Sequence, residues 1–170
     1  MKRIFIPILF VLLSILLTSC GSNSRKEYTM GKDGLFYNRS NQRLFNGEII
    51  DTVNVIIQYD VVKGKKNGLF ITHYLDGKVE KFGFIENNMN EGEWKYYYPT
   101  GTLESIGCYE NSKAEGKWVT YYSTGVIKSE GNYLNSEKEG RWILYNQTGK
   151  MINIISYRDG EIINVQNRVS

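Results

Sequence analysis

Apolar and polar positions alternate with a period of two in short stretches of this chain, and the alternation itself recurs every 24 residues. The clearest stretch opens with Gly-Glu-Trp-Lys-Tyr-Tyr-Tyr at residues 92–98, turns at Pro-Thr-Gly and resumes from Thr102 to Tyr109. Short runs that are rich in aromatic residues and bounded by turn residues are typical of β-strands. The pattern predicts a β-hairpin over residues 92–109, followed by a polar loop over residues 110–115.

Four columns of residues hold the same period of 24 residues. Three columns are glycine and one is aromatic: Gly68, Gly92, Gly116 and Gly140; Gly77, Gly101, Gly125 and Gly149; Gly83, Gly107 and Gly131; and Phe70, Trp94, Trp118 and Trp142. A fixed period of this length indicates a tandem array in which each unit packs on its neighbours. We predict an all-β protein, an elongated and twisted antiparallel β-meander of about ten strands built from tandem 24-residue β-hairpin repeats. The repeats are expected at about 44–67, 68–91, 92–115, 116–139 and 140–163.

Alternation along the strands sorts the side chains onto two faces. In the first strand of each unit the aromatic column alternates with charged residues, namely Glu93, Lys117 and Arg141. In the second strand we expect Val79, Leu103, Ile127 and Met151 to share a face with the glycine column, and Glu80, Glu104, Lys128 and Glu130 to lie opposite. A glycine inside a strand leaves room for a bulky neighbour. We therefore expect Trp94, Trp118 and Trp142 to pack over Gly83, Gly107 or Gly131 of an adjacent hairpin.

The N-terminus has the pattern of an export signal. Lys2 and Arg3 precede an apolar run over residues 4–17, which ends in Leu-Thr-Ser-Cys at Cys20. A basic start, a short apolar stretch and small residues before a cleavage point describe a secretory signal peptide. The segment resembles a bacterial lipoprotein signal, which implies cleavage before Cys20 and attachment of palmitate or a similar acyl chain to it. A plain secretory signal or membrane anchor with an incidental cysteine is the alternative.

These patterns divide the chain into three parts. Residues 1–19 are expected to be the signal peptide, and residues 20–34, with the lipidated cysteine, a flexible tether rich in Gly, Ser, Asn, Lys and Arg. Residues 35–170 are expected to form the repeat domain.

Composition excludes some classes of function. The chain has 21 Lys and Arg against 18 Asp and Glu, and removal of Lys2 and Arg3 lowers the first count to 19, which leaves a net charge near +1. A nearly neutral chain offers no electrostatic footprint for nucleic acid. We therefore expect no nucleic-acid partner.

Candidate catalytic groups are sparse. The single histidine, His73, fills the repeat position of Tyr97 and Tyr121, and Cys108 has no second histidine near it to activate a thiolate. No Cys, His or Asp cluster has metal-ligand spacing, so we expect no metal and no cofactor. A carboxylate column, Glu91, Glu115 and Glu139, is interpreted as solvated loop edges, with a weak cation site as the alternative. The sequence therefore predicts a protein that is not an enzyme.

The unit at 92–107, Gly-Glu-Trp-Lys-Tyr-Tyr-Tyr-Pro-Thr-Gly-Thr-Leu-Glu-Ser-Ile-Gly, resembles the MORN repeat, in the variant form of bacterial lipoproteins and of antitoxin-like or immunity-like proteins. The resemblance covers about residues 45–160. The departures are a first unit without the turn glycine, Phe70 in place of tryptophan, and Ile155 in place of the last glycine of its column. The resemblance implies a non-enzymatic scaffold for protein association near a membrane.

Together these observations predict a lipid-anchored envelope protein, expected at the outer membrane and facing the periplasm or the cell exterior. We expect a protein partner to bind the aromatic face or a sheet edge, because aromatic residues are favoured anchors in interfaces. The candidate binding residues are Tyr96, Tyr98 and Tyr122. Two alternatives stay open, a glycan or other envelope ligand that stacks on the aromatic face, and a passive structural spacer.

Overall fold

The structure is a computed structural model that describes residues 26–52 and 55–167. The predicted signal peptide over residues 1–19 and the predicted lipidation of Cys20 lie outside the described residues.

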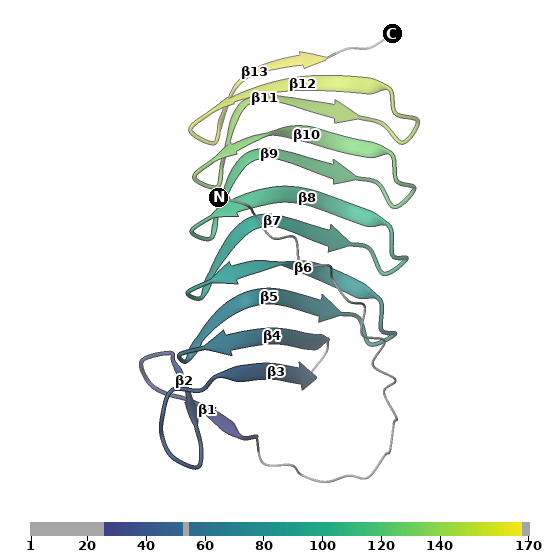
Figure 1. The fold of residues 1–170 in the computed structure, drawn as a ribbon. Helices are drawn as coiled ribbons and strands as arrows, with labels where there is room; N and C mark the ends of the chain where they lie inside the picture. The colour runs from purple at the N-terminus through teal and green to yellow at the C-terminus, as the bar shows by residue number, and fades with distance from the viewer. Residues whose placement is uncertain (1–25, 53–54, 168–170) are drawn as a thin grey trace, which may run out of the picture.

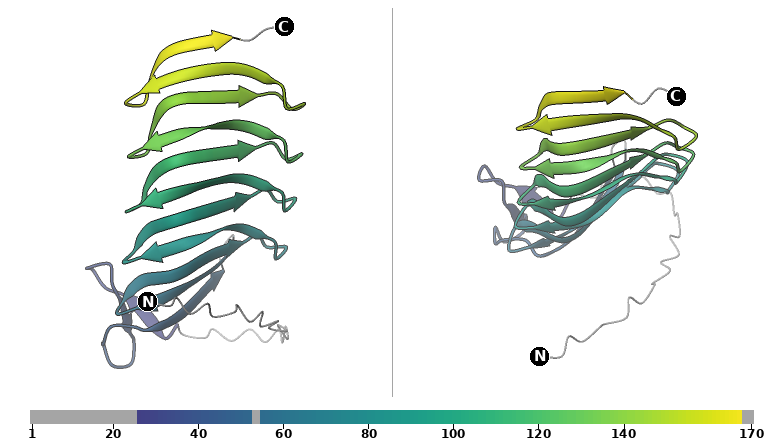
Figure 2. Two further views of the ribbon diagram at one scale, coloured as in Figure 1. Left: turned by 45° about the horizontal axis from the view of Figure 1, so that its top comes forward. Right: turned by 90° about the horizontal axis from the view of Figure 1, so that it is seen from above.

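The described chain is all-β, and eleven of its strands form one antiparallel sheet in chain order (Figure 1). Each strand pairs with the strands before and after it, so the sheet is a continuous meander from β3 to β13. It twists along its length, as the turned views show (Figure 2). The strands are β3 (Gly47–Thr52), β4 (Ile56–Val62), β5 (Lys65–His73), β6 (Val79–Glu86), β7 (Met89–Tyr97), β8 (Leu103–Glu110), β9 (Lys113–Tyr121), β10 (Ile127–Leu134), β11 (Glu137–Tyr145), β12 (Met151–Arg158) and β13 (Glu161–Asn167). The predicted twisted meander of tandem hairpins is confirmed.

The predicted polar loop over residues 110–115 is wrong, because β8 and β9 join through a two-residue turn. Asn111 and Ser112 both have positive φ, 51° and 65°, and Lys113 already belongs to β9. Positive φ at both central residues is the type I′ geometry, whose twist matches that of the flanking strands. Asparagine tolerates this conformation, so the Asn-Ser pair favours a tight hairpin turn. The polar character of the segment alone had suggested a longer loop.

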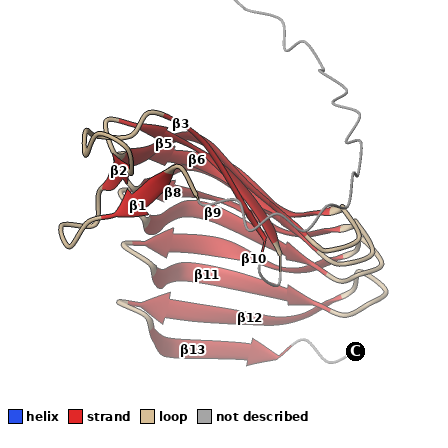
Figure 3. Ribbon diagram, turned by 90° about the horizontal axis from the view of Figure 1, so that it is seen from below, coloured by secondary structure: helices blue, strands red, loops and turns tan. Residues whose placement is uncertain are grey.

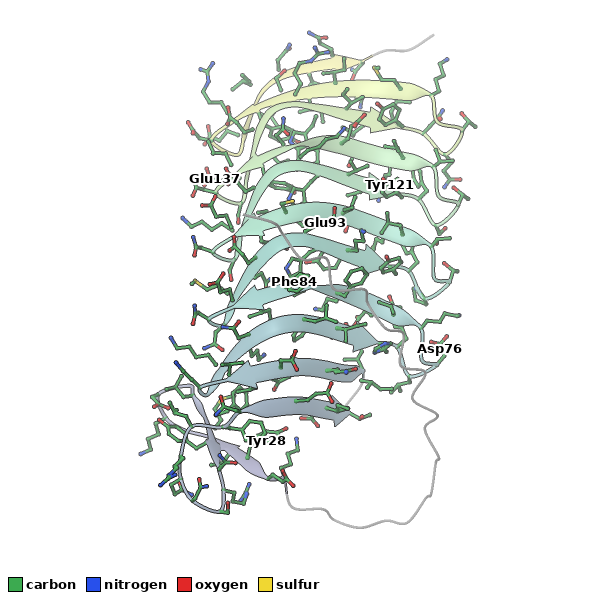
Figure 4. All side chains as sticks on the ribbon, in the orientation of Figure 1. Tyr28, Asp76, Phe84, Glu93, Tyr121 and Glu137 are labelled. Carbon is green, nitrogen blue, oxygen red and sulfur yellow. The ribbon has the colours of Figure 1, made fainter. Side chains whose placement is uncertain are left out.

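The other row of turns uses glycine, as expected. In the turn after β7 the amide of Gly101 donates to the carbonyl of Tyr98 at 2.8 Å, and Gly101 has φ +92°. The two turn types alternate along the chain and form two rows of loops at opposite ends of the strands (Figure 3). Asp76 and Glu137 mark the two rows in the side-chain view (Figure 4).

A β-bulge explains the glycine column that contains Gly92. Between β6 and β7, Phe84 pairs with Glu91 and Phe82 pairs with Lys95, so β7 advances by four residues while β6 advances by two. Gly92 lies in this bulge with φ +67°, and a Cβ atom there would meet nothing within 4 Å. The position therefore requires glycine for its backbone conformation and not for space.

The N-terminal end of the sheet is covered by a separate two-stranded ribbon, β1 (Tyr28–Met30) and β2 (Phe36–Asn38). Phe36, Phe45, Ile49 and Val61 form a buried cluster there, against which Tyr28 packs. The described part of the predicted tether, residues 26–34, thus contains a strand, which corrects the expectation of a flexible segment. The cause is Tyr28, whose ring contacts Phe36 at 5.7 Å between centroids and gives this polar segment an apolar anchor.

Candidate functional site

The tryptophan column packs as the sequence predicts. A Cβ atom built on Gly83 would collide with the ring of Trp94, one on Gly107 with that of Trp118, and one on Gly131 with that of Trp142. In each case the ring lies over a glycine of the preceding hairpin. The three tryptophans are only 3%, 8% and 3% exposed, and they are the main buried side chains in the middle of the sheet. We call this side of the sheet the aromatic face.

Indole hydrogen bonds fix each ring in place. The indole nitrogen (Nε1) of Trp94 donates to the carbonyl of Phe84 at 3.1 Å, and that of Trp118 to the carbonyl of Cys108 at 3.2 Å. Tyrosine rings fill the gaps between the indoles. For example, Tyr133 contacts Trp142 edge-on, with the ring centroids 5.1 Å apart. Ring contacts of this kind run without a break from Tyr28 to Tyr157. The aromatic face is therefore first of all a single-layer hydrophobic core.

The repeats at both ends depart from the pattern for reasons that the packing supplies. Tyr59 occupies the position in the first repeat that glycine holds in the following repeats. Its ring stacks on that of Phe70, with the ring centroids 5.8 Å apart. Because a second ring takes up space there, the smaller phenylalanine replaces tryptophan. At the other end β13 places Val165 opposite Ile155. Among the described residues no tryptophan ring follows that would have to pack over position 155, so this position does not require glycine.

The hydroxyls of the three candidate binding tyrosines are engaged within the sheet, those of Tyr98 and Tyr122 between adjacent hairpins and that of Tyr96 within one hairpin. The hydroxyl of Tyr98 donates to the carbonyl of Tyr121 at 2.7 Å, and that of Tyr122 to the carbonyl of Tyr145 at 2.8 Å. Tyr96 is half-buried, and its hydroxyl pairs with that of Tyr109 at 3.0 Å. Burial, and after it the bond to Tyr109, raises the pKa of Tyr96 well above its ordinary value. The hydroxyls are thus engaged within the fold, and only parts of the rings face solvent.

A second series of bulges corrects the predicted faces of the second strands. Tyr96 pairs with Ser105 but Tyr97 pairs with Leu103, so Glu104 is an extra residue and Leu103 moves to the face of Tyr97. The same shift moves Val79, Ile127 and Met151 away from the glycine column. It brings Glu80 onto the aromatic face, where the hydroxyl of Thr72 donates to its carboxylate at 2.9 Å. Glu104 and Lys128 occupy the equivalent bulges, so the expectation that they lie opposite was wrong as well.

The opposite face, which we call the outer face, holds the charges that the sequence places there. Lys117 pairs with Glu130 at 2.8 Å across β9 and β10, and the hydroxyl of Tyr145 donates to the other oxygen of Glu130 at 2.8 Å. The Lys117 ammonium, and after it Tyr145, holds the pKa of Glu130 below its ordinary value, against burial, which raises it.

An apolar patch interrupts these charges on β5 and β6. It consists of two cross-strand pairs, Leu69 with Phe84 and Ile71 with Phe82, and we call it the outer patch. Leu69 is 43% and Phe84 59% exposed. In the later hairpins the pair equivalent to Leu69 and Phe84 is charged or polar, as in Lys117 with Asn132. This patch was not predicted from the sequence, although Leu69 is the apolar member of a column that is otherwise charged, with Glu93, Lys117 and Arg141.

The carboxylate column has a structural role. Glu91 accepts the amide of Asn111 at 3.0 Å, and Glu115 accepts the amide of Asn135 at 2.8 Å. Each carboxylate thus ties its strand to the next type I′ turn, which the interpretation as solvated edges did not foresee. Over the described residues no cluster of three or more His, Cys, Asp or Glu could hold a metal ion. His73 pairs with Ile56 and Val79, and Cys108 is exposed and not in a disulfide.

One concave site lies on the aromatic face near its C-terminal end. It is a groove of about 170 Å³ over β10, β11 and β12, and we call it the C-terminal groove. Its lining includes Tyr122, Lys128, Lys138, Trp142, Ile152 and Tyr157. The Lys128 ammonium lies 5.8 Å from the Tyr122 ring centroid, and the Lys138 ammonium 4.5 Å from that of Trp142. Both distances are within the range of cation–π attraction.

This architecture defines the class of the protein, a tandem hairpin-repeat protein whose core is a single layer of aromatic side chains. Within that class, the model of the MORN repeat variant matches residues 90–111, 114–135 and 138–159. The chain therefore contains three tandem MORN-repeat variant units, at the same 24-residue period as the glycine columns. No curated protein matches the sequence. The described residues form no helix that is long and apolar enough to cross a membrane.

Proposed function

We propose that this protein is a membrane-anchored, non-enzymatic scaffold of the bacterial cell envelope whose repeat domain binds a protein partner. The anchor part of the proposal rests on the lipoprotein-like signal that ends at Cys20. The binding part rests on one observation, the exposed outer patch, because large apolar side chains that gather on a surface mark interaction sites. Leu69 and Phe84 are exposed apolar residues at a cross-strand position that is charged or polar in the later hairpins.

A glycan-binding role receives less support from the geometry. Stacking on a sugar needs an exposed ring face, but the tryptophans are buried, and two of the candidate tyrosines, Tyr98 and Tyr122, donate their hydroxyls to neighbouring hairpins. A passive spacer would have no need of the outer patch. A toxin domain, as the resemblance to antitoxin-like proteins implies, is a narrower form of the protein-binding proposal.

Crosslinked pull-down from intact envelopes tests the binding part, with the full chain tagged at Ser170 as bait. The informative variant combines Leu69→Lys with Phe84→Asn, because Lys117 and Asn132 already form that pair between β9 and β10 and the sheet accepts it. We expect wild type to recover one protein in near-stoichiometric amount and the double variant to lose it. A matched control, Leu75→Lys, places the same change on a side chain that is 66% exposed in a turn and should keep the partner. Recovery of bait alone by wild type would contradict the proposal.

The anchor is tested separately by Cys20→Ser. We expect this variant to lose labelling by a fatty-acid analogue and to leave the membrane fraction, while Cys108→Ser keeps both properties. Continued acylation of Cys20→Ser would refute the lipoprotein interpretation and would leave the binding test unaffected.

A further inference from the structure

The C-terminal groove differs from the equivalent surface of the earlier repeats in its charge. Lys128 occupies the bulge position that holds Glu80 and Glu104 in the preceding hairpins. Lys138 occupies the position of Ala114, because the strands repeat every 24 residues. The aromatic face thus changes along the stack from acidic bulges to a pair of lysines around one groove.

Neither lysine is neutralised by a carboxylate in the part of the chain that the structure describes. The ion pairs of that part involve Lys26, Lys78, Lys95 and Lys117. Lys128 and Lys138 instead lie over aromatic rings, and Lys138 is also 5.0 Å from the ring centroid of Tyr157. Their positive charge therefore remains available to an anionic group of a ligand.

The size of the groove limits what can enter it. Pockets for small molecules and cofactors usually enclose about 300–1,000 Å³, whereas this groove encloses about 170 Å³. That space suits one large apolar side chain, and the apolar wall of Trp142, Ile152 and Tyr157 matches such an occupant. A single side chain in a pocket with an aromatic wall is the usual form of an interface anchor.

We propose that the C-terminal groove binds one large apolar side chain of an acidic segment of a protein partner, with Lys128 and Lys138 pairing with carboxylates on either side of that side chain. The inference rests on the proposed function only in taking the partner to be a protein. The groove and the outer patch lie on opposite faces, so the two sites fail or succeed separately. The lysines select the charge of the segment, and the groove selects the size of its central side chain.

The test uses the full chain in zwitterionic detergent micelles and three short peptides as probes. The first is acetyl-Asp-Glu-Phe-Glu-Asp-amide, the second has Ala in place of Phe, and the third has Lys in place of each acid. Binding is followed by the indole ¹⁵N–¹H signals, because only the indole of Trp142 borders the groove while those of Trp94 and Trp118 serve as internal references. We expect the first peptide to shift the Trp142 signal in a saturable way, and the other two to leave it unchanged.

Two substitutions that the chain itself uses in other repeats keep the fold intact. Lys128→Glu reproduces Glu104, and Lys138→Ala reproduces Ala114. The double variant should bind the first peptide at least about tenfold more weakly, since two solvent-exposed charge pairs are lost and one is replaced by repulsion. Lys113→Ala, a control at the start of β9 and outside the groove lining, should bind as wild type does.

Three results would overturn the inference. The first is no saturable shift of the Trp142 signal with the acidic Phe peptide, and the second is an equal response to the Lys or Ala peptide. In the third, anionic phosphatidylglycerol vesicles shift the Trp142 signal and the acidic Phe peptide does not, which would assign the groove to a lipid surface. None of these results bears on the pull-down through the outer patch, so failure here leaves the proposed function standing.

Discussion

The ring of Trp118 occupies the space that a Cβ atom on Gly107 would take. Real Cβ atoms do not come within 3.0 Å of such neighbours, and a buried indole cannot swing away as the end of a flexible side chain can. The same relation joins Trp94 to Gly83. Glycine in the second strand and tryptophan in the next first strand are therefore one packing unit shared by two repeats.

Gly107→Ile is expected to destabilise the protein by about 3 kcal/mol or more, because the new side chain must displace the Trp118 ring from a well-packed site. The change does not act through strand propensity, since Ile155 stands at the same position of the last repeat. Adding Trp118→Val removes the indole that the new isoleucine would meet and should recover part of the loss. Unfolding in urea across the four variants gives the coupling free energy, and a value near zero would refute the packing unit.

Trp118→Ala is expected to lower the free energy of unfolding by about 3–5 kcal/mol, as for other buried aromatic rings. The ring is 8% exposed and contacts Tyr96, Tyr109 and Tyr133. Urea unfolding followed by circular dichroism measures the change. A loss within experimental error would mean that the tryptophan is not part of the core.

Tyr98→Phe is expected to cost about 1 kcal/mol, because it removes the hydroxyl that ties β7 to the carbonyl of Tyr121 in the next hairpin. Tyr121→Phe is the matched control, since the Tyr121 hydroxyl makes no hydrogen bond to the described residues. Thermal unfolding of both variants compares the two changes. Equal melting temperatures would show that the hydrogen bond between the hairpins contributes nothing to stability.

The Lys117, Glu130 and Tyr145 contacts predict a pH dependence of stability. Because the pKa of Glu130 is lowered in the folded protein, its contribution is fully present above the ordinary carboxyl value of about 4.3 and is lost as pH falls through the lower folded value. We expect Glu130→Gln to cost about 0.5–1 kcal/mol at neutral pH, and the difference from wild type to close in acid. Urea unfolding at neutral and at acidic pH measures it, with Glu110→Gln as an exposed control. A difference that stays constant with pH would contradict the assignment.

Much of the fold could be predicted because the same turn residues and the same alternation recur in each repeat. The Gly101 turn, the two strands and the aromatic column follow from turn chemistry and period-two alternation, and the 24-residue period then fixes how units follow one another. The packing of Trp118 on Gly107 was predictable as well, since a glycine within a strand signals a bulky neighbour.

The bulges were beyond the reach of alternation. A single extra residue, such as Glu80 or Glu104, moves the strand residues on one side of the bulge to the opposite face of the sheet. A period-two pattern does not indicate where such an extra residue occurs. The misplacement of Lys128 had the same cause. The C-terminal groove therefore could not be assembled from the sequence.

Neighbours within one or two hairpins fix the class of structure, the repeat unit and the ring that fills each glycine space, so these features follow from the sequence alone. The folded arrangement was needed to show which tyrosines link adjacent hairpins and which carboxylates bind turns. It also showed where Leu69 meets Phe84 and where Lys128 and Lys138 line one groove. Those outcomes depend on strand register across several hairpins. The register is set by bulges and turns acting together, and it decides which side chains face solvent.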